Sequence, residues 1–293
     1  MKRKKATPWL YSLPSMILVG IIVLVPIVYT GYISLTNMNL YHWTEYDVIG
    51  LKNYGRALLK LDSGFLSAVG FTLLWTVTNI VLQVVLSFFI ALALNAKGLR
   101  LSRLYKTLLM FPWAMPAYVS ILVWKVGMYN TEFGLLNKVL RSLGLPKMNY
   151  LAENVPAFFA CLVLNLWMAL PFMITTIDGA LKSIDSSMYE SATLDGAGFW
   201  QKSIYITIPS MRGIIAPAVI MTTFTTFKQF DIVYLLTKQK GSLSGATIQT
   251  IITFAHEKAF VSNNYGLSSA VTMVIFTLII LFSLWTNRST TKD

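Results

Sequence analysis

Charged residues and cysteine are both scarce in this sequence. Only 12% of its 293 residues are charged, whereas about a quarter is usual for a soluble domain. Apolar residues make up 55% of the chain, and the mean hydropathy is +0.61. The single cysteine, Cys161, excludes a disulfide framework and a cysteine-based metal site. This composition indicates an integral membrane protein.

Histidines and nucleotide-binding motifs are scarce as well. The two histidines, His42 and His256, both fall in predicted loops and do not suggest a metal centre. No G-x-x-x-x-G-K-[ST] phosphate loop occurs, so ATP cannot be hydrolysed here by that route. The net charge is +12, but basic residues lie beside apolar runs rather than in a patch with interleaved aromatics. We therefore expect no metal, no cofactor and no nucleic-acid partner for this chain.

Six apolar runs separated by polar segments predict an all-α integral membrane fold with six transmembrane helices. Each run has roughly the 20 residues that a helix needs to cross a bilayer. The runs are residues 11–33, 65–94, 105–128, 155–181, 213–236 and 265–285. We expect the first to remain as an uncleaved helix. The chain would form a single transmembrane domain, residues 1–293, with core helices at about residues 65–287.

The distribution of Lys and Arg predicts the orientation of these helices. Of the 24 basic residues, thirteen fall in segments that would be cytoplasmic and nine in segments that would lie outside. Eight of the thirteen crowd the N-terminal tail and the short loop at residues 97–106, where the positive-inside rule acts most strongly. Both termini would therefore be cytoplasmic. Residues 37–63, 129–153 and 238–264 would lie outside, with a short amphipathic helix in the sequence GLLNKVLRSLGL.

A polar segment, MYESATLDGAGFWQKSIYITIP, lies between the fourth and fifth apolar runs. Ser187 and Glu190 have the spacing of a helix N-terminal capping box. Gly196 permits a tight turn that residues with a Cβ resist, and a second short helix is predicted from Phe199. Pro209 cannot donate a backbone hydrogen bond and predicts a break in the helix. The segment is predicted to be a helix–turn–helix.

The spacing in this segment resembles the cytoplasmic loop of binding-protein-dependent ABC importer permeases. The family pattern is Glu-Ala-Ala, three residues, Gly, nine residues, Ile-x-Leu-Pro. Here it reads Glu190–Ala192, then Gly196, then Ile206–Pro209, with Ser191 and Ile208 as departures. We name residues 182–210 the coupling loop. The alternative is an ordinary loop helix in which the glutamate serves only its own cap.

The resemblance implies that the coupling loop docks into a groove of a separate ATPase. The glutamate of the family pairs there with a basic residue, which implies that Glu190 makes the contact and Gly196 the turn. Tyr189 and Thr193 would share the exposed face. The residues expected to form the ATPase contact are Met188, Glu190, Ser191, Ala192, Leu194, Asp195, Gly196 and Pro209.

The likeness extends over nearly the whole chain and points to sugar permeases. FPWAMPAYVSILVW, GLLN, residues 231–237 and NNYGL resemble the maltose-type member of a permease pair, while Lys238–Gly241 departs from it. The resemblance implies a plasma-membrane heterodimer with a second homologous permease, an ABC ATPase dimer that binds ATP, and an extracellular solute-binding protein. That protein would deliver a di- or oligosaccharide. A glycerol-phosphate-type importer remains the alternative for substrate.

Polar residues within the apolar runs suggest where a sugar would pass. Polar groups in a bilayer core are costly and face the bundle interior or a water-filled cavity. The candidate residues are Tyr118, Asn165, Trp167, Gln229 and Asp231. The alternatives are packing or an interfacial belt for the aromatic residues, an interhelical hydrogen bond for the asparagine, and pairing of Asp231 with Lys228.

Two other classes of function fit the sequence less well. An ion-coupled secondary transporter would explain charge within the spans, but such folds usually have internal repeats, and none is found in this sequence. A membrane-embedded enzyme would need a nucleophile, base or metal cluster. One cysteine and no histidine within the predicted spans do not provide it.

The orientation can be tested by labelling single introduced cysteines after Cys161 is replaced. In intact cells, an impermeant thiol reagent should label a cysteine at position 141 and leave one at position 190 unlabelled, because only the first would lie outside. Permeabilised cells provide the control, in which both positions should react. The opposite labelling pattern would show that the topology is inverted.

Overall fold

The computed structural model describes residues 3–59, 64–96, 98–238 and 247–290. In these residues every regular element is a helix, which confirms the all-α prediction. The chain divides into two compact units, and α4 (Phe65–Leu94) contributes to both. The first unit holds residues 1–69 and 251–293, and the second holds residues 70–250.

Several helical stretches are long and apolar enough to cross a bilayer. Five qualify singly, and a bent pair of helices supplies a sixth if it is counted as one span. The predicted runs at residues 65–94 and 155–181 match α4 and α8 (Asn154–Lys182) within one residue. The described structure therefore contains five or six candidate spans.

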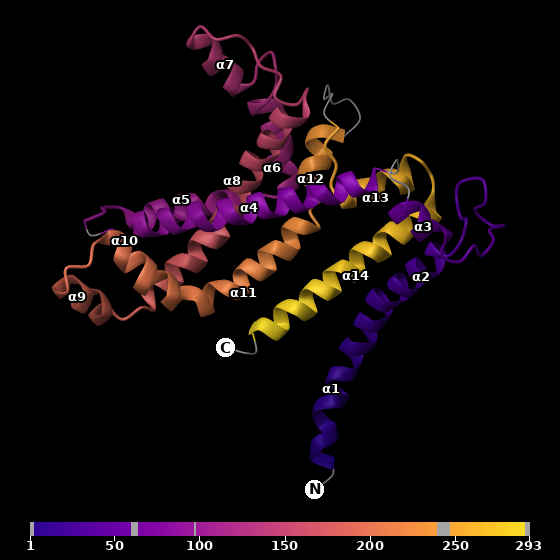
Figure 1. The fold of residues 1–293 in the computed structure, drawn as a ribbon, viewed down its shortest axis with the longest axis horizontal. Coiled ribbons are helices and arrows are strands. Elements are labelled where there is room, and N and C mark those ends of the chain that lie inside the picture. Colours follow the sequence, from indigo (N-terminus) through magenta and orange to yellow (C-terminus); the bar gives the residue numbers. More distant parts are fainter. Residues whose placement is uncertain (1–2, 60–63, 97, 239–246, 291–293) are drawn as a thin grey trace. The chain divides into compact units, whose positions relative to one another are not determined.

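The first unit is built around helices from both ends of the chain. Its helices are α1 (Arg3–Val19), η1 (Gly20–Leu24), α2 (Val25–Ser34), α3 (Lys52–Leu59), α13 (Ile251–Phe260) and α14 (Tyr265–Thr290). Helices α2 and α14 pack side by side (Figure 1). Helix α13 occupies part of the predicted last outer loop, so the placement of His256 in a loop was wrong.

One glycine allows the close approach of α14 to the chain after α2. A Cβ on Gly266 would overlap the carbonyl oxygen of Thr36. That oxygen also accepts a hydrogen bond of 2.7 Å from Asn53 Nδ2, which donates as well to the Ser34 carbonyl at 3.0 Å. The glycine in the NNYGL segment is therefore required by packing.

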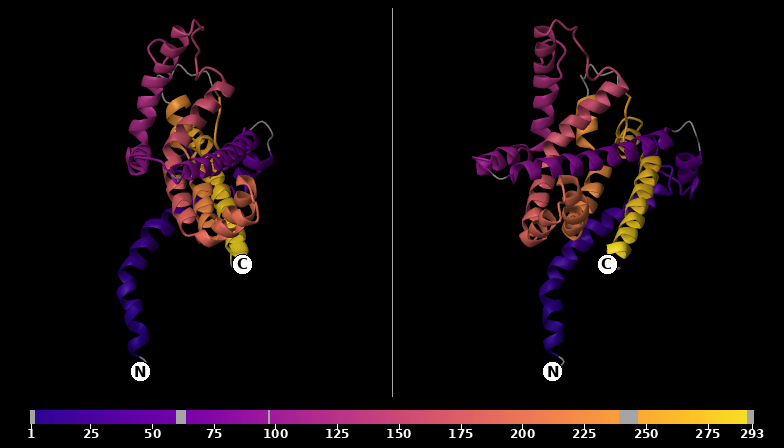
Figure 2. Two further views of the ribbon diagram at one scale, coloured as in Figure 1. Left: turned by 90° about the vertical axis from the view of Figure 1, so that its left-hand side faces the viewer. Right: turned by 60° about the vertical axis from the view of Figure 1, so that its left-hand side comes forward.

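The second unit contains the remaining helices. They are α5 (Ser102–Ala114), α6 (Ala117–Val123), η3 (Trp124–Met128), α7 (Leu135–Ser142), α8, α9 (Ser186–Leu194), α10 (Phe199–Lys202), η4 (Ser203–Thr207), α11 (Ile208–Phe227), α12 (Asp231–Val233) and η5 (Tyr234–Lys238). Helix α8 packs against α5 and α11. Helices α7 and α9 lie at opposite ends of this unit (Figures 1 and 2).

The predicted third span is not one straight helix. Helix α5 ends at Ala114, and α6 begins at Ala117 after a bend of 95°. Met115 is extended, with φ −81° and ψ 141°. A residue before proline is pushed out of the helical region, so Pro116 sets the position of the bend. Pro112 is accommodated inside α5.

The fifth span also differs from prediction. The chain stays helical from Phe199 through Pro209, so the predicted break at this proline was wrong. Pro209 lies in the first turn of α11, directly after η4. The break comes instead between α11 and α12. Lys228 and Asp231 therefore do not share a helix, and no ion pair joins them in the described structure.

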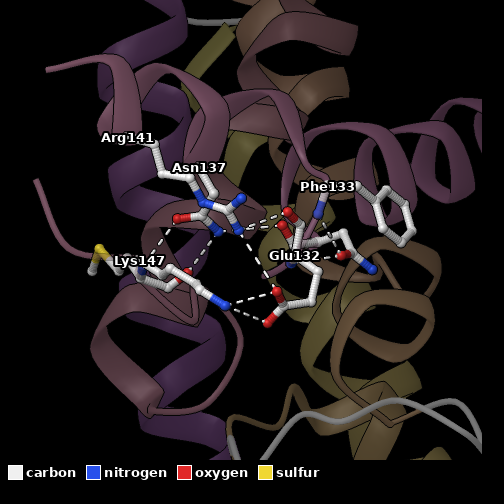
Figure 3. Close-up of polar contacts among 7 residues, drawn as sticks. Glu132, Phe133, Asn137, Arg141 and Lys147 are labelled. Carbon is white, nitrogen blue, oxygen red and sulfur yellow. Dashed lines mark hydrogen bonds and ion pairs between the residues drawn. The ribbon is translucent and has the colours of Figure 1, made fainter. Parts of the chain in front are cut away.

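The segment that follows η3 is held together by side-chain hydrogen bonds and ion pairs (Figure 3). The Asn137 side chain donates to the Met148 carbonyl at 2.9 Å and accepts from the Met148 N–H at 2.9 Å. Glu132 accepts from Lys147 Nζ at 2.7 Å and lies 3.6 Å from Arg141. The hydrogen bond from Lys147 holds the pKa of Glu132 below its ordinary value. The predicted amphipathic helix is present here as α7.

Replacing Gly266 with alanine should destabilise the protein. The new Cβ would overlap backbone atoms, and such overpacking costs about 1–3 kcal/mol. The matched control is Gly31→Ala in α2, where a Cβ would meet only the end of a flexible Met273 side chain at 3.7 Å. Thermal unfolding in detergent should show a lower melting temperature for Gly266→Ala alone. Equal melting temperatures would contradict the packing argument.

Candidate functional site

Within the coupling loop, α9 and the short α10 are separated by a turn. Helix α9 begins at Ser186, and its N-cap is Asp185, whose carboxylate accepts from the Ser187 N–H at 2.9 Å. This hydrogen bond lowers the pKa of the Asp185 carboxyl. The predicted capping box of Ser187 and Glu190 was therefore wrong. Because aspartate supplies the cap, Glu190 is not used for it.

Gly196 ends α9 in a left-handed conformation. Its φ is +77°, which favours glycine over residues with a Cβ. The Ala197 N–H donates to the Ala192 carbonyl at 2.8 Å, and the Gly196 N–H donates to the Thr193 carbonyl at 3.1 Å. This pair of bonds is a Schellman motif, which satisfies carbonyls at the helix end. The backbone thus reverses at a defined residue.

Side chains brace the two halves of the coupling loop. The Tyr189 hydroxyl lies 2.9 Å from the Thr207 hydroxyl, and Lys202 Nζ donates to the Thr193 hydroxyl at 2.9 Å. The Gln201 side chain accepts from the Gly198 N–H at 2.7 Å. Tyr189 is half-buried, so it faces the second helix rather than solvent. The loop therefore holds its shape through its own contacts.

The outward face of α9 combines a carboxylate with apolar groups. Leu194 is 90% exposed and Met188 is 44% exposed. The Glu190 side chain is exposed and has no hydrogen bond or ion pair within the described part of the chain. Ser191, Asp195, Gly196 and Pro209 are exposed as well, while Ala192 is half-buried. Exposed apolar groups of this kind mark interaction surfaces.

Three amides meet in the interior of the second unit. The Asn165 side chain on α8 donates to Asn79 Oδ1 on α4 and accepts from Gln229 Nε2 at 2.9 Å. Asn79 is fully buried, Asn165 is 4% exposed, and Gln229 is half-buried. Burial of such groups is costly unless they are hydrogen-bonded. We call these three residues the amide cluster.

A cavity of about 330 Å³ opens beside the amide cluster. Its walls come from α5, α8 and α11 and carry an indole, two amides and several hydroxyls. The polar and aromatic residues that line it are Trp113, Asn165, Phe172, Thr222, Thr225, Thr226 and Gln229. Flat aromatic faces and hydrogen-bonding side chains are the groups that sugar recognition requires.

The structure brings together only part of the predicted sugar path. Asn165 and Gln229 line the cavity, whereas Tyr118, Trp167 and Asp231 are not among its lining residues. Trp167 packs against Trp124, with ring centroids 5.3 Å apart. Tyr118 is 55% exposed on α6, and Asp231 is exposed at the start of α12. The roles of all five residues in transport stay predictions.

Sequence reasoning missed the contribution of α4. Thr72, Thr76, Asn79, Gln83 and Ser87 recur at helical spacing in an otherwise apolar helix, and all five are buried. This polar stripe was visible in the sequence. Neither amide atom of Gln83 has a hydrogen-bond partner within the described residues. Trp113 was also missed, because an aromatic residue near a proline carries no pattern that separates a cavity wall from packing.

Comparison with known families gives one match over most of the chain. Residues 83–290 match the family described as binding-protein-dependent transport system inner membrane component. The match begins within α4, and it covers α9, Gly196 and the amides of α8 and of the segment before α12.

Similar proteins and structures agree with this match. The chain is 30% identical to the galactooligosaccharides transport system permease protein GanP of Bacillus subtilis, covering 97% of this chain and 70% of that protein. It is also 30% identical to the trehalose/maltose transport system permease protein MalF of Thermococcus litoralis, covering 96% and 92%. Its fold resembles that of a bacterial ABC transporter involved in alginate import, with TM-score 0.81, 18% identity and coverage of 99% and 98%.

Proposed function

Because the chain belongs to the family of binding-protein-dependent transport system inner membrane components, we propose that it is the permease subunit of an ABC importer for a di- or oligosaccharide. The relatives are transport permeases rather than catalysts. In this proposal the chain forms a single transmembrane domain of six spans in the plasma membrane. Both termini are cytoplasmic, and the bent pair α5–α6 counts as one span.

The observation that carries this proposal is the exposed face of α9. The Glu190 carboxylate has no hydrogen bond or ion pair in the described part of the chain, and Asp185 already supplies the helix cap. The Leu194 side chain is exposed to solvent. A carboxylate beside apolar groups matches a protein groove that offers a basic residue. The Schellman turn and the Tyr189–Thr207 contact hold this face in place. We assign this face to an ABC ATPase dimer, which binds the ATP.

The cavity beside the amide cluster supports a sugar as the cargo. Its indole, amides and hydroxyls suit a ring with many hydroxyl groups, and no Lys or Arg lines it. A phosphate ester would favour a cationic wall, so the glycerol-phosphate alternative has less support. Relatives named for galactooligosaccharides and for trehalose/maltose agree with an oligosaccharide.

The proposal includes three protein partners. A second, homologous permease would complete the pathway, and the ATPase dimer would drive it. An extracellular solute-binding protein would deliver the sugar; one structure with a similar fold was determined in complex with a pentasaccharide-bound periplasmic protein. Helix α7 lies at the opposite end of the second unit from α9 (Figure 1), which suits delivery at one end and energy input at the other.

Glu190→Ala should stop transport without preventing membrane insertion. If the ATPase pairs with this carboxylate in a desolvated groove, loss of one partner costs roughly 3–5 kcal/mol, which weakens docking more than about 100-fold. The measurement is copurification of the ATPase with the tagged permease, together with sugar uptake. The control is Glu153→Ala, which removes an exposed carboxylate at the N-cap position of α8. Normal copurification and uptake for Glu190→Ala would contradict the proposal.

Trp113→Leu and Gln229→Leu should each reduce sugar uptake. Each loses a group that faces the cavity, and a lost hydrogen bond or stacking contact of about 1–3 kcal/mol corresponds to about a 5–150-fold change. ATPase copurification should stay at the wild-type level. Trp9→Leu, which changes a tryptophan that is 68% exposed on α1, is the control. Uptake that survives both changes together would place the sugar path elsewhere.

A further inference from the structure

A second cavity lies between α5 and α8, at the end of the unit where α8 leads into the coupling loop. Its volume is about 550 Å³. Basic side chains and apolar side chains both contribute to its walls. Those that matter here are Arg103, Lys106, Met110, Pro171, Ile174 and Lys182. We call it the basic groove, and the proposed function gives it no role.

A single carboxylate holds two of the cations in the basic groove. Asp178 accepts from Lys106 Nζ at 2.8 Å and, through its other oxygen, from Lys182 Nζ at 2.7 Å. It also accepts from Asn95 Nδ2 at 2.7 Å. The Asp178 side chain is only 13% exposed, while Lys106 and Lys182 are 29% and 58% exposed. Both ammonium groups therefore keep N–H donors that can reach a further acceptor.

Arg103 leaves the groove with an excess of positive charge. Its guanidinium is exposed and has no hydrogen bond or ion pair among the described residues. The groove thus holds three cations and one anion within its lining. A guanidinium offers paired N–H donors that match the oxygens of a phosphate. The chemistry of this end of the groove favours a phosphate-bearing ligand.

The rest of the groove identifies the kind of molecule that carries the phosphate. Among its lining residues, Leu109 and Met110 follow Lys106 along α5, and Pro171 and Ile174 precede Asp178 along α8. On the same helix, α5, Leu108 is 60% exposed. A water-soluble phosphate makes no use of such walls, whereas the acyl chain of a phospholipid is apolar and packs against them. A cationic end continuous with an apolar slot fits an amphiphile.

We propose that the basic groove binds an anionic phospholipid, with its phosphate at Arg103 and Lys182 and an acyl chain between α5 and α8. The site rests on the proposed orientation, which places this end of the spans at the cytoplasmic leaflet. Anionic lipids give that leaflet a negative surface potential, and basic pockets between transmembrane helices bind their head groups. Lys182 is the last residue of α8 and lies four residues before α9, so the lipid would contact the base of the coupling loop.

The test measures lipid retention by the full transporter, assembled with its partner subunits and purified in detergent. Native mass spectrometry counts phosphatidylglycerol molecules retained when equal amounts of phosphatidylglycerol and phosphatidylcholine are supplied. The wild-type complex should prefer phosphatidylglycerol, and Arg103→Gln should retain at least fivefold less of it. Arg100→Gln is the matched control, because Arg100 is an exposed cation three residues earlier that does not line the groove. It should retain lipid as the wild type does.

Other results would overturn the proposal. Equal loss in Arg100→Gln and Arg103→Gln would show general attraction between a basic loop and anionic lipid. Displacement of the lipid by millimolar inorganic phosphate would show a site for a free anion. No preference for phosphatidylglycerol in the wild-type complex would show that a partner covers the groove or that lipid does not enter it. Neither sugar nor ATP is needed, so lipid binding can fail while uptake persists, and the reverse.

Discussion

Asn165 is the residue on which the interior of the second unit depends. Its amide donates to Asn79 on α4 and accepts from Gln229 between α11 and α12. Burial of such amide groups is costly unless they are hydrogen-bonded within the protein. One side chain thus fixes the relative rotation of α4, α8 and the end of α11. The cavity proposed for the sugar adjoins this point, since Asn165 and Gln229 are also among its lining residues.

The sequence predicted the helices that are straight and missed the places where they bend. Helices α4 and α8 were located within one residue, because long apolar runs are read directly from hydropathy. The bend at Pro116 was missed, since a proline can be absorbed inside a helix or can end it. Pro112 and Pro209 were absorbed, and Pro116 was not. Tertiary packing decides between these outcomes, and local sequence does not contain it.

In the coupling loop, too, residue patterns predicted some features, and others depend on contacts that the sequence does not show. The turn at Gly196 and the start of the second helix at Phe199 followed from residue type and spacing. The cap did not, because Asp185 and Ser187 are both good cap residues and only the backbone path selects one. Two members of the amide cluster, Asn165 and Gln229, were predicted to lie on the sugar path, whereas Asn79 was missed. Asn165 and Gln229 stand out in apolar surroundings, but nothing in their spacing shows that their side chains bond to each other. Residues Lys238–Gly241, where the sequence departs from the family, lie mostly outside the described residues.

The 95° bend between α5 and α6 has a consequence for how the protein is made. Helix α5 has 13 residues and is about 20 Å long, which is short of the hydrocarbon thickness of about 30 Å. The helical stretch from Ala117 to Met128 is also shorter than the hydrocarbon thickness. Neither helix alone is therefore long enough to cross the hydrocarbon core. Helix α5 packs on α8, which is synthesised later. The packing of α5 is therefore completed only after the later segment has been made.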